Sequence, residues 1–424
     1  MIDTIQLTAP KGPIKGTINL PTSKSIANRY LILSAISDGK LTINHLSESD
    51  DTQILSKLLT SPPTDGIYDA HHAGTTSRFL LAYFALQQGT QVITGSGRLK
   101  TRPIKALADA LISLGAQLTY LEKDGCLPIQ VDSPEGIATE VTLSGGVSSQ
   151  FITALLLNAA SLPQGLTIHI DGEWISRPYI EMTLKVLNEV GIKHTLTDTS
   201  IQIIPQTISE TTLSVESDWS AASYFIAIAC ARPGSNILLP KLYEDSIQGD
   251  SQVLSRISAY GCEYQFEVGG LRVVNNHKAE DSYPSMLEMN LEDTPDIFQT
   301  FAALHSVLGI SCMYSGLSTL PGKETNRITA MQAELQKGVT FLSELPARFS
   351  SKSNEKYYLQ EGKAKLSESP TYETYQDHRM AMSLALLSLV GPVQIKDPGV
   401  VSKSFPSYWK ALKSLGFEIK DVTN

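Results

Sequence analysis

Six segments of the chain share one hydrophobic pattern, in which a short polar signal precedes a long apolar run. Leu, Ile and Phe are the commonest large residues of these runs and small residues stand between them, which is typical of helices buried on all sides. The signals recur about every 50 to 80 residues. The six segments are SKSIANRYLILSAI (23–36), TTSRFLLAYFAL (75–86), VSSQFITALLLNAA (147–160), WSAASYFIAIACA (219–231), TPDIFQTFAALHSV (294–307) and DHRMAMSLALLSL (377–389).

Each apolar run is followed by a turn and a short β-like segment, such as KLTINHL (40–46) or GLTIHI (165–170). Most units then continue into a second, more polar helix that ends near a glycine, as in IKALADALISLGAQL (104–118). Strand–helix repeats of this size predict an α/β fold of two domains with three repeated units in each.

The first unit is shorter than the other five. After DDTQILSKLLT (50–60) the chain passes through SPPTDGIYDAHHAG (61–74) directly into the second unit. This connection has no room for the second helix and hairpin that end a complete unit, so we expect a truncated first repeat.

Length and composition agree with a two-domain globular protein. The chain has 424 residues, of which 42% are hydrophobic and 18% charged. The net charge of −9 argues against binding to nucleic acid. The four cysteines lie far apart, which predicts buried, reduced thiols and no metal site. The N-terminal segment lacks the pattern of a signal peptide and no stretch is apolar enough for a membrane span, so we expect a cytoplasmic protein.

Cationic side chains gather near the starts of the apolar helices and in the turns between units. Helix N-termini attract anions, and Arg adds a bidentate fork for carboxylate or phosphate. Cations concentrated in this way in an acidic protein indicate a multiply charged anionic ligand. The eight cations are Lys24, Arg29, Arg78, Arg102, Lys323, Arg327, Arg379 and Lys403.

Polar and acidic side chains at the same helix starts allow two interpretations. Hydroxyl and amide groups there act either as helix caps or as ligands for phosphate and polar rings. Asp296 and Glu324 are either a cap and a surface ion pair, or two carboxylates that share acid–base work. The triplet 377–379 is either an Asp cap with two solvated neighbours or an anion clamp. The hydroxyl and amide residues are Ser25, Ser148, Ser149, Gln150 and Ser176.

Taken in order, these segments resemble the motifs of the enolpyruvyl transferases. The resemblance runs from LPTSKSIANRYL (20–31) to DPGVVSKSFPSYW (397–409), nearly the whole chain. Between them lie AGTTSRF, TRPI, VSSQF, SRPYIE, TPD, KETNR and QDHRMAM. The set is most similar to the branch of the family that acts on shikimate 3-phosphate.

The resemblance implies a fold of two inside-out β/α domains with the active site in the cleft between them. One domain would span residues 19–216, and the other would combine residues 1–18 with residues 217–424. The implied reaction transfers the enolpyruvyl group of phosphoenolpyruvate to the 5-hydroxyl of shikimate 3-phosphate and releases phosphate. It implies no metal, no organic cofactor, no nucleic-acid or membrane partner, and a monomer.

Carried over motif by motif, the resemblance also implies the roles of individual residues. Asp296 would accept the hydroxyl proton, Glu324 with Lys24 would handle the methylene proton, and His378 would lie beside Arg379. The contacts to shikimate 3-phosphate would be Lys24, Ser25, Arg29, Ser148, Ser149, Gln150, Ser176, Asp296 and Lys323. The contacts to phosphoenolpyruvate would be Lys24, Gly74, Arg102, Gln150, Arg327, Arg379 and Lys403.

Two positions depart from the family pattern and bear on ligand binding. Thr319 stands where many members have Asn, and Phe79 follows Arg78 where Pro is frequent. The resemblance further implies that glyphosate competes with phosphoenolpyruvate. Because Gly74 has no side chain, we expect room for the inhibitor, and we expect a methyl group added there to meet only this longer molecule.

One alternative belongs to the same family, and two belong to other classes of protein. An enolpyruvyl transferase acting on UDP-N-acetylglucosamine would have Asn after the first Lys and a reactive Cys, whereas here Ser25 follows Lys24 and Cys126 lies in the strand-like DGCLPIQV. A catalytically inactive anion-binding homologue is opposed by the two retained carboxylates. An RNA-end-modifying relative is opposed by the acidic net charge.

Overall fold

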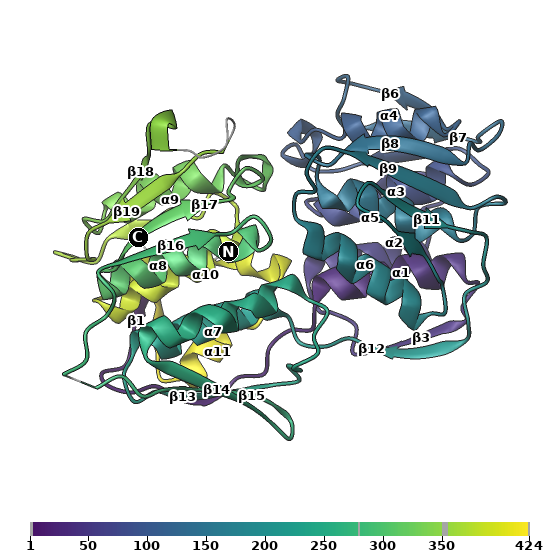
Figure 1. The fold of residues 1–424 in the computed structure, drawn as a ribbon. Coiled ribbons are helices and arrows are strands. Elements are labelled where there is room, and N and C mark those ends of the chain that lie inside the picture. The colour runs from purple at the N-terminus through teal and green to yellow at the C-terminus, as the bar shows by residue number, and fades with distance from the viewer. Residues whose placement is uncertain (1–2, 279, 350–354, 423–424) are drawn as a thin grey trace. The chain divides into compact units, whose positions relative to one another are not determined.

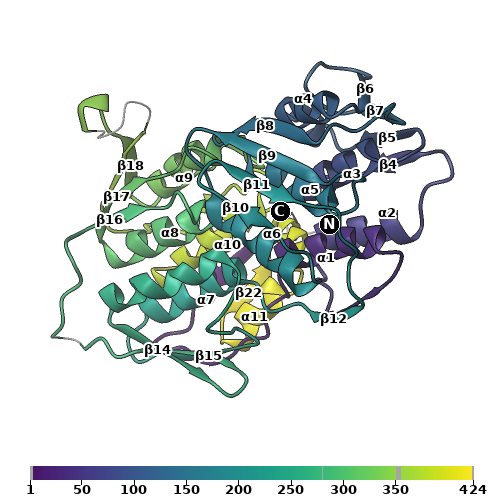
Figure 2. The same cartoon turned by 45° about the vertical axis from the view of Figure 1, so that its right-hand side comes forward.

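The computed structural model describes residues 3–278, 280–349 and 355–422. The chain divides into two compact units (Figures 1 and 2). The continuous unit is Thr22–Val215, and the discontinuous unit combines Met1–Pro21 with Glu216–Asn424. Both units mix helices with small sheets, which confirms the predicted α/β class.

The continuous unit contains the three apolar helices expected from the first half of the sequence, α1, α3 and α5. Its helices are α1 (Lys24–Ile36), α2 (Asp50–Thr60), α3 (Gly74–Ala85), η1 (Leu99–Thr101), α4 (Lys105–Ser113), α5 (Ser149–Ala159) and α6 (Arg177–Glu189). Its strands are β3 (Leu41–Asn44), β4 (Ile67–Asp69), β5 (Gln91–Thr94), β6 (Gln117–Tyr120), β7 (Ile129–Asp132), β8 (Glu140–Ser144), β9 (Leu166–Asp171), β10 (Thr195–Leu196), β11 (Ser200–Ile203) and β12 (Thr211–Ser214).

The discontinuous unit contains the other three apolar helices, α7, α8 and α10. Its helices are α7 (Trp219–Ala231), η2 (Gly249–Tyr260), η3 (Pro295–Ile297), α8 (Phe298–Leu308), η4 (Leu320–Gly322), α9 (Arg327–Gln336), η5 (Ala347–Phe349), α10 (His378–Leu384), η6 (Ala385–Leu389), η7 (Pro398–Lys403) and α11 (Tyr408–Ser414). Its strands are β1 (Thr4–Thr8), β2 (Lys15–Thr17), β13 (Asn236–Pro240), β14 (Cys262–Glu267), β15 (Gly270–Asn275), β16 (Met286–Asn290), β17 (Ser311–Ser315), β18 (Phe341–Glu344), β19 (Tyr358–Glu361), β20 (Thr371–Tyr372), β21 (Val393–Lys396) and β22 (Glu418–Asp421).

One strand arrangement recurs along the chain. In the sheet β4-β5-β7-β6, β4 pairs in parallel with β5, and the β6–β7 hairpin adds to β5 through β7. The sheets β10-β11-β9-β8 and β16-β17-β19-β18 repeat this pairing. In each of the three units an apolar helix connects the two parallel strands, as a parallel pair requires. The repeat predicted from the hydrophobic pattern is therefore present in the strand pairing.

The N-terminal segment supplies two strands that later repeats lack. Strand β1 lies between β21 and β22 and is antiparallel to both, so it completes the sixth sheet. Strand β2 pairs in parallel with β13 and completes the fourth sheet. In the same way β12 pairs in parallel with β3, and the first repeat has this two-stranded sheet without a hairpin. The predicted truncation is confirmed.

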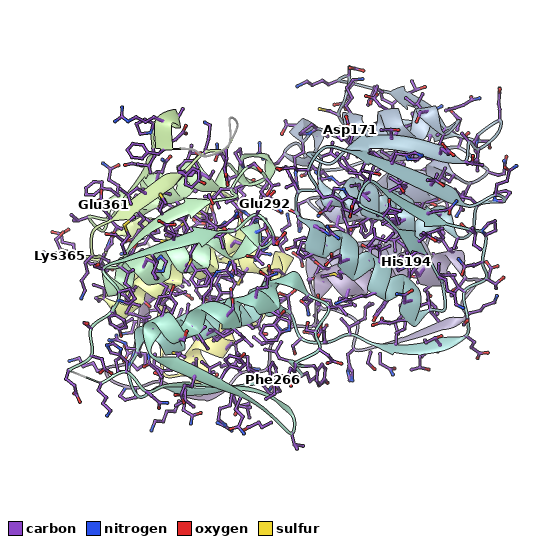
Figure 3. All side chains as sticks on the ribbon, viewed as in Figure 1. Asp171, His194, Phe266, Glu292, Glu361 and Lys365 are labelled. Carbon is purple, nitrogen blue, oxygen red and sulfur yellow. The ribbon has the colours of Figure 1, made fainter. Side chains whose placement is uncertain are left out.

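The apolar helices form the centre of each unit. Helix α8 contacts α7 and α10, and the helices α1, α3 and α5 contact one another. All residues of α10 and all of α7 except Ser220 are buried, and side chains fill the space between helices and sheets (Figure 3). Full burial of one Leu or Phe side chain contributes roughly 1.5–3 kcal/mol, so these helices account for much of the stability.

Three local predictions need correction. The sixth apolar run is not one regular helix, because α10 ends at Leu384 and continues as the 3₁₀ segment η6. Asp296 does not begin the fifth helix: it lies in η3, and Ile297 occupies the N-cap position of α8. The second, more polar helix expected after the fourth apolar run, DSQVLSRISAYGCEY (250–264), forms as the 3₁₀ segment η2 rather than as a regular α-helix.

Candidate active site

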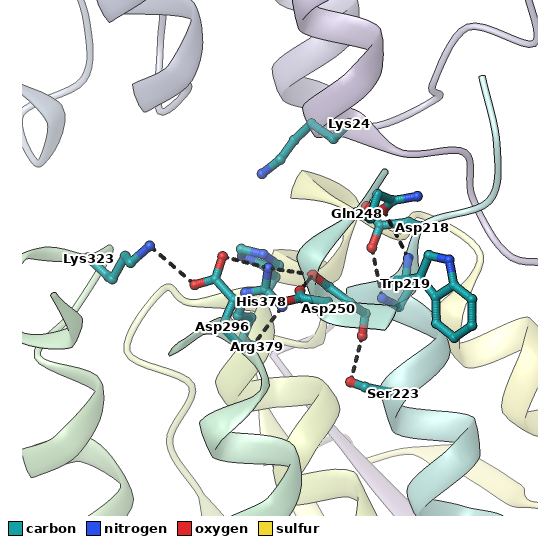
Figure 4. Close-up of polar contacts among 12 residues, drawn as sticks. Lys24, Asp218, Trp219, Ser223, Gln248, Asp250, Asp296, Lys323, His378 and Arg379 are labelled. Carbon is teal, nitrogen blue, oxygen red and sulfur yellow. Dashed lines mark hydrogen bonds and ion pairs between the residues drawn. The ribbon is translucent and has the colours of Figure 1, made fainter. Parts of the chain in front are cut away.

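Asp296 forms ion pairs with three cationic side chains of the discontinuous unit. Its Oδ1 lies 3.2 Å from Lys323 Nζ and 2.8 Å from Arg327 Nη1, and its Oδ2 lies 3.1 Å from Arg379 Nη2. Figure 4 shows Asp296 between Lys323 on one side and Arg379 on the other. The side chain makes no cap bond to α8, so the interpretation of Asp296 as a simple helix cap is wrong.

Charge sets the ionisation of Asp296 and Lys323. Burial by itself would raise the pKa of Asp296, but Arg379, Lys323 and Arg327 together hold that pKa well below its usual range. Burial lowers the pKa of Lys323, and the opposing pull of Asp296 does not cancel this effect. The carboxylate is therefore ionised at neutral pH.

Arg327 binds three carboxylates at once. It is the first residue of α9, and its guanidinium donates to Asp296 Oδ1 at 2.8 Å, to Glu324 Oε2 at 2.9 Å and to Asp377 Oδ2 at 2.8 Å. Burial would lower its pKa, but these carboxylates raise the pKa of Arg327 above its ordinary value. Arg327 therefore fixes the carboxylates of Asp296, Glu324 and Asp377 relative to one another.

Glu324 lies between two cations. Its Oε2 accepts from Arg327, and its Oε1 accepts from Lys403 Nζ at 2.7 Å. Lys403 ends η7, and its side chain is only 8% exposed. The ion pair between Glu324 and Lys403 is therefore not an exposed surface salt bridge, which would contribute little to stability.

At the triplet 377–379 the Asp cap that the sequence allowed is present, and the two side chains after it are buried. Asp377 is the N-cap of α10 and accepts a hydrogen bond from the backbone N–H of Arg379 at 2.9 Å. Arg379 points its guanidinium at Asp296, with Nη1 donating to the Asp296 backbone oxygen at 3.1 Å. His378 is 2% exposed, and its Nδ1 lies 3.6 Å from Asp377 Oδ1. The expectation of two solvated side chains behind the cap is wrong.

Two residues of this network were missed in the sequence. The hydroxyl of Ser220, in the first turn of α7, accepts a hydrogen bond from Arg379 Nη2 at 3.2 Å and donates one to Asp250 Oδ2. Asp250 lies in η2 and is 4% exposed. The QGD sequence at 248–250 carries no charge cluster, so nothing in the local pattern separated Asp250 from an ordinary loop aspartate.

In the continuous unit, Lys24 begins α1 and Ser23 caps that helix through a bond from the Ile26 N–H. Lys24 Nζ lies 3.4 Å from Asp51 Oδ2, and the Asp51 side chain is 2% exposed. The ammonium group of Lys24 is therefore held by a buried carboxylate from α2.

Arg29 is buried and already bonded on four sides. It donates to the Ser25 backbone oxygen at 2.7 Å, the Tyr179 backbone oxygen at 3.0 Å, and the hydroxyls of Thr183 at 2.9 Å and Thr153 at 3.3 Å. Burial lowers the pKa of Arg29 to about 10. Its contacts tie α1 to α5 and α6, and they use four of the five N–H groups of the guanidinium.

Gly74 and Arg102 lie against each other at the start of α3. A Cβ atom on Gly74 would come within 2.6 Å of Arg102 Nη1. The expectation that a methyl group here would meet only a long inhibitor is therefore wrong, because the cation itself stands in the way. Nearby, Arg78 Nη1 donates to Gln150 Oε1, and Gln150 Nε2 donates to Thr75 Oγ1 at 3.2 Å.

The two predicted serine ligands at N-cap positions do not cap their helices through their side chains. Ser148 and Ser176 occupy the N-cap positions of α5 and α6, and neither makes a side-chain cap bond. Ser176 adopts the left-handed region, with φ 55°. Ser149 is the first residue of α5, and Ser25 follows Lys24 in α1. The cap interpretation is thus wrong for Ser148 and Ser176.

The other sequence features have plain structural outcomes. The four cysteines are free and buried, as predicted. Within the described ranges, no group of three His, Cys, Asp or Glu side chains is arranged to hold a metal ion. No helix in the same ranges has both the length and the apolar character that a membrane span needs.

Comparison with known proteins decides the family. The model of the family "EPSP synthase (3-phosphoshikimate 1-carboxyvinyltransferase)" matches residues 8–61 and 56–412. The chain belongs to the EPSP synthase family.

Curated members of the EPSP synthase family match over the full length. The 3-phosphoshikimate 1-carboxyvinyltransferase of Bacteroides fragilis (strain YCH46) is 39% identical over 416 residues, which cover 98% of each chain. The enzyme of the same name from Aliivibrio salmonicida (strain LFI1238) is 33% identical over 435 residues, covering 96% of this chain and 98% of the relative.

Solved structures agree on the fold. The EPSP synthase from Acinetobacter baumannii superposes with a TM-score of 0.75 at 18% identity, covering 99% of this chain and 100% of that one. The enolpyruvyl transferase NikO from Streptomyces tendae gives 0.73 at 12% identity, with both chains covered completely. The match to the EPSP synthase family does not favour the UDP-N-acetylglucosamine enzyme or the inactive homologue as alternatives.

Proposed function

We propose that this chain transfers the enolpyruvyl group of phosphoenolpyruvate to the 5-hydroxyl of shikimate 3-phosphate, with release of phosphate. The observation that carries the proposal is Asp296, an ionised and largely shielded carboxylate ringed by Lys323, Arg327 and Arg379 in a member of the EPSP synthase family. Both substrates carry a phosphate and a carboxylate, so the same cations that hold Asp296 suit the substrates.

The cations also explain how Asp296 becomes a base. While Lys323, Arg327 and Arg379 surround it, its low pKa makes it a poor proton acceptor. An anionic substrate attracts the same three cations and weakens their hold on the carboxylate. The pKa of Asp296 then rises toward the working pH, where a general base is most effective, and Asp296 accepts the proton of the attacking hydroxyl.

We assign the methylene proton to Glu324 and Lys24. Addition delivers a proton to the methylene carbon of phosphoenolpyruvate, and elimination of phosphate removes a proton from the methyl group so formed. Glu324 is held by Arg327 and Lys403 at 2.9 and 2.7 Å, which fixes its carboxylate for transfer in both directions. Lys24, held by Asp51, supplies the second group.

The remaining predicted residues are proposed to bind the anionic and hydroxyl groups of the substrates. Arg379, Arg327 and Lys403 would hold phosphoenolpyruvate together with Gly74, Arg102 and Gln150 of the continuous unit. The hydroxyl groups of Ser148 and Ser176 make no helix-capping hydrogen bond, so they can donate to phosphate oxygens. We assign Arg29 a positioning role for Ser25 besides any direct contact, because it donates to the Ser25 backbone oxygen.

The proposal extends to the organisation of the chain. We infer that the continuous and discontinuous units are the two family domains, for which the sequence predicted residues 19–216 and residues 1–18 with 217–424. A monomeric state stays a prediction from the resemblance, and a cytoplasmic location stays a prediction from the sequence pattern.

A phosphate-release assay tests the reaction. The enzyme is supplied with shikimate 3-phosphate and phosphoenolpyruvate, and each substrate is omitted in turn. We expect release only when both are present. Release with UDP-N-acetylglucosamine in place of shikimate 3-phosphate, or no release with any acceptor, would overturn the proposal.

A further inference from the structure

Asp250 is a buried carboxylate beside the predicted acid–base group, and neither motif nor resemblance assigned it a role. It is 4% exposed, and its Oδ2 accepts the hydrogen bond from the Ser220 hydroxyl. Its Oδ1 is buried and has no hydrogen-bond partner among the described residues. A buried, half-satisfied carboxylate costs stability, so its presence here points to a function.

Ser220 links Asp250 to Arg379. The only hydrogen of a serine hydroxyl can serve one acceptor, and Ser220 gives it to Asp250. Its oxygen then stays available to Arg379 Nη2 at 3.2 Å. With the two bonds from Arg379 to Asp296, at 3.1 Å each, this contact fixes the plane of the guanidinium.

We propose that Asp250, acting through Ser220, is a positioning residue that holds the Arg379 guanidinium in place for phosphoenolpyruvate. This inference rests on the proposed function, in which Arg379 binds that substrate. An ionised Asp250 must accept the hydroxyl hydrogen, which keeps the serine oxygen turned to Arg379. A protonated Asp250 can donate to the same oxygen and so competes with Arg379.

The charged groups around Asp250 determine the pH at which this competition begins. Asp296 from η3, Arg379 from α10 and Asp218 from the cap of α7 face it, together with the Ser220 hydroxyl. Burial and then repulsion by Asp296 raise the pKa of Asp250 to about 6, against the opposing pull of Arg379. Below about pH 6 the positioning is therefore lost, and the KM for phosphoenolpyruvate should rise.

Three variants test the link by steady-state kinetics of the whole enzyme from pH 5.5 to 8. Ser220→Ala and Asp250→Ala each remove one end of the link, and we expect KM for phosphoenolpyruvate to rise about tenfold with a smaller change in kcat, as for one charge-assisted hydrogen bond. Asp250→Asn keeps an acceptor for Ser220 but cannot titrate. We expect its KM at pH 7.5 to stay near that of the parent enzyme, and the rise in KM below pH 6 to disappear.

Ser223→Ala is the matched control. Ser223 lies one turn further along α7, is buried, and bonds to the Ser220 backbone oxygen at 2.7 Å and to Thr300 Oγ1 at 3.1 Å. A merely structural role for Ser220 would lower the melting temperature of both serine variants and leave both KM values unchanged. We expect instead that only Ser220→Ala changes KM.

The outcomes separate this inference from the proposed function. A folded Ser220→Ala enzyme with the KM of the parent, or a folded Asp250→Asn enzyme whose KM still rises below pH 6 as in the parent, would overturn the positioning role while phosphate release by the parent upholds the reaction. A parent enzyme that releases no phosphate with both substrates would overturn the reaction, and this inference with it. If Asp250→Ala fails to fold, the other two variants still decide.

Discussion

Arg327 donates a hydrogen bond from Nε to Asp377 Oδ2 at 2.8 Å, and the two side chains are 2% and 0% exposed. The other oxygen of Asp377 caps α10 through the Arg379 N–H. One carboxylate therefore sets both the start of α10 and the direction of the Arg327 guanidinium. The stability of the discontinuous unit and the geometry of its cations depend on the same residue.

Asp377→Ala should be strongly destabilising. Loss of one partner from a buried ion pair leaves the other charge uncompensated and typically costs about 3–5 kcal/mol. Denaturant unfolding in a Trp174→Phe background would report the discontinuous unit, since Trp219 and Trp409 are the remaining tryptophans. The exposed Asp245 of the same unit provides the control, and Asp245→Asn should change stability by less than about 0.5 kcal/mol. Equal stabilities for the two variants would contradict the role of the pair.

Glu324→Gln should lower kcat by about 10²-fold or more, because it removes a group proposed to transfer the methylene proton. The structure adds a second effect. A carboxylate accepts from both Arg327 and Lys403, whereas a glutamine must turn its NH₂ group toward one of these cations. We therefore expect a moderate rise in KM as well. Glu373→Gln, which breaks an exposed pair with Lys396, should leave kcat unchanged, and a near-normal kcat for Glu324→Gln would remove Glu324 from the mechanism.

Gly74→Ala should weaken the binding of phosphoenolpyruvate as well as that of glyphosate. The new methyl group would displace the Arg102 guanidinium, and the loss of one charge-assisted contact corresponds to about a tenfold rise in KM. Glyphosate, which we expect to compete with phosphoenolpyruvate, should lose affinity by at least the same factor. Gly97→Ala is a fitting control, because a Cβ atom there meets nothing within 4 Å. An unchanged KM for phosphoenolpyruvate in Gly74→Ala would show that Arg102 can move aside without cost.

His305 should make the stability of the discontinuous unit depend on pH. Its ring nitrogens lie 2.7 Å from the Tyr260 hydroxyl and 2.6 Å from the Tyr314 hydroxyl, and burial lowers the pKa of His305 to about 3. The unfolded chain binds a proton below about pH 6.5 and the folded chain does not, so stability falls as the pH drops from about 6.5 toward 3.

The size of this effect follows from linkage. The free energy of unfolding should fall by about 1.4 kcal/mol per pH unit more in the parent than in His305→Gln, over the range where only the unfolded state is protonated. Denaturant midpoints measured at pH 4.5, 5.5 and 6.5 would show it. Parallel pH dependences for the two proteins would mean that His305 accepts its proton in the folded state.

The sequence predicted the repeated architecture well because its signals are local. Apolar runs, glycine turns and β-like segments lie within each unit, and the strands after all six apolar helices occur where expected. Strand pairings across the chain carry no such signal. That β1 joins β21 and β22, and that β2 joins β13, depends on contacts between residues hundreds of positions apart.

The residues of the candidate site that could be predicted are those that lie in recognisable sequence motifs. Asp296, Lys323, Glu324, Arg327, Arg379 and Lys403 do, and the structure brings these six residues together. Asp250 and Ser220 were missed because their importance arises only from where η2 and α7 place them relative to Arg379. The part played by Asp51 at Lys24 was missed for the same reason, since α2 and α1 meet only in the folded chain.

Mass spectrometry of the product formed in D₂O tests the central claim, that this site adds a proton to the methylene carbon of phosphoenolpyruvate and removes one again. The enzyme, shikimate 3-phosphate and phosphoenolpyruvate are combined in D₂O, and the enolpyruvyl product is analysed. The account predicts deuterium in the vinyl CH₂ group, because the transient methyl group holds one solvent-derived hydrogen and loses one of three. A product that carries no deuterium, formed at the normal rate, would contradict it.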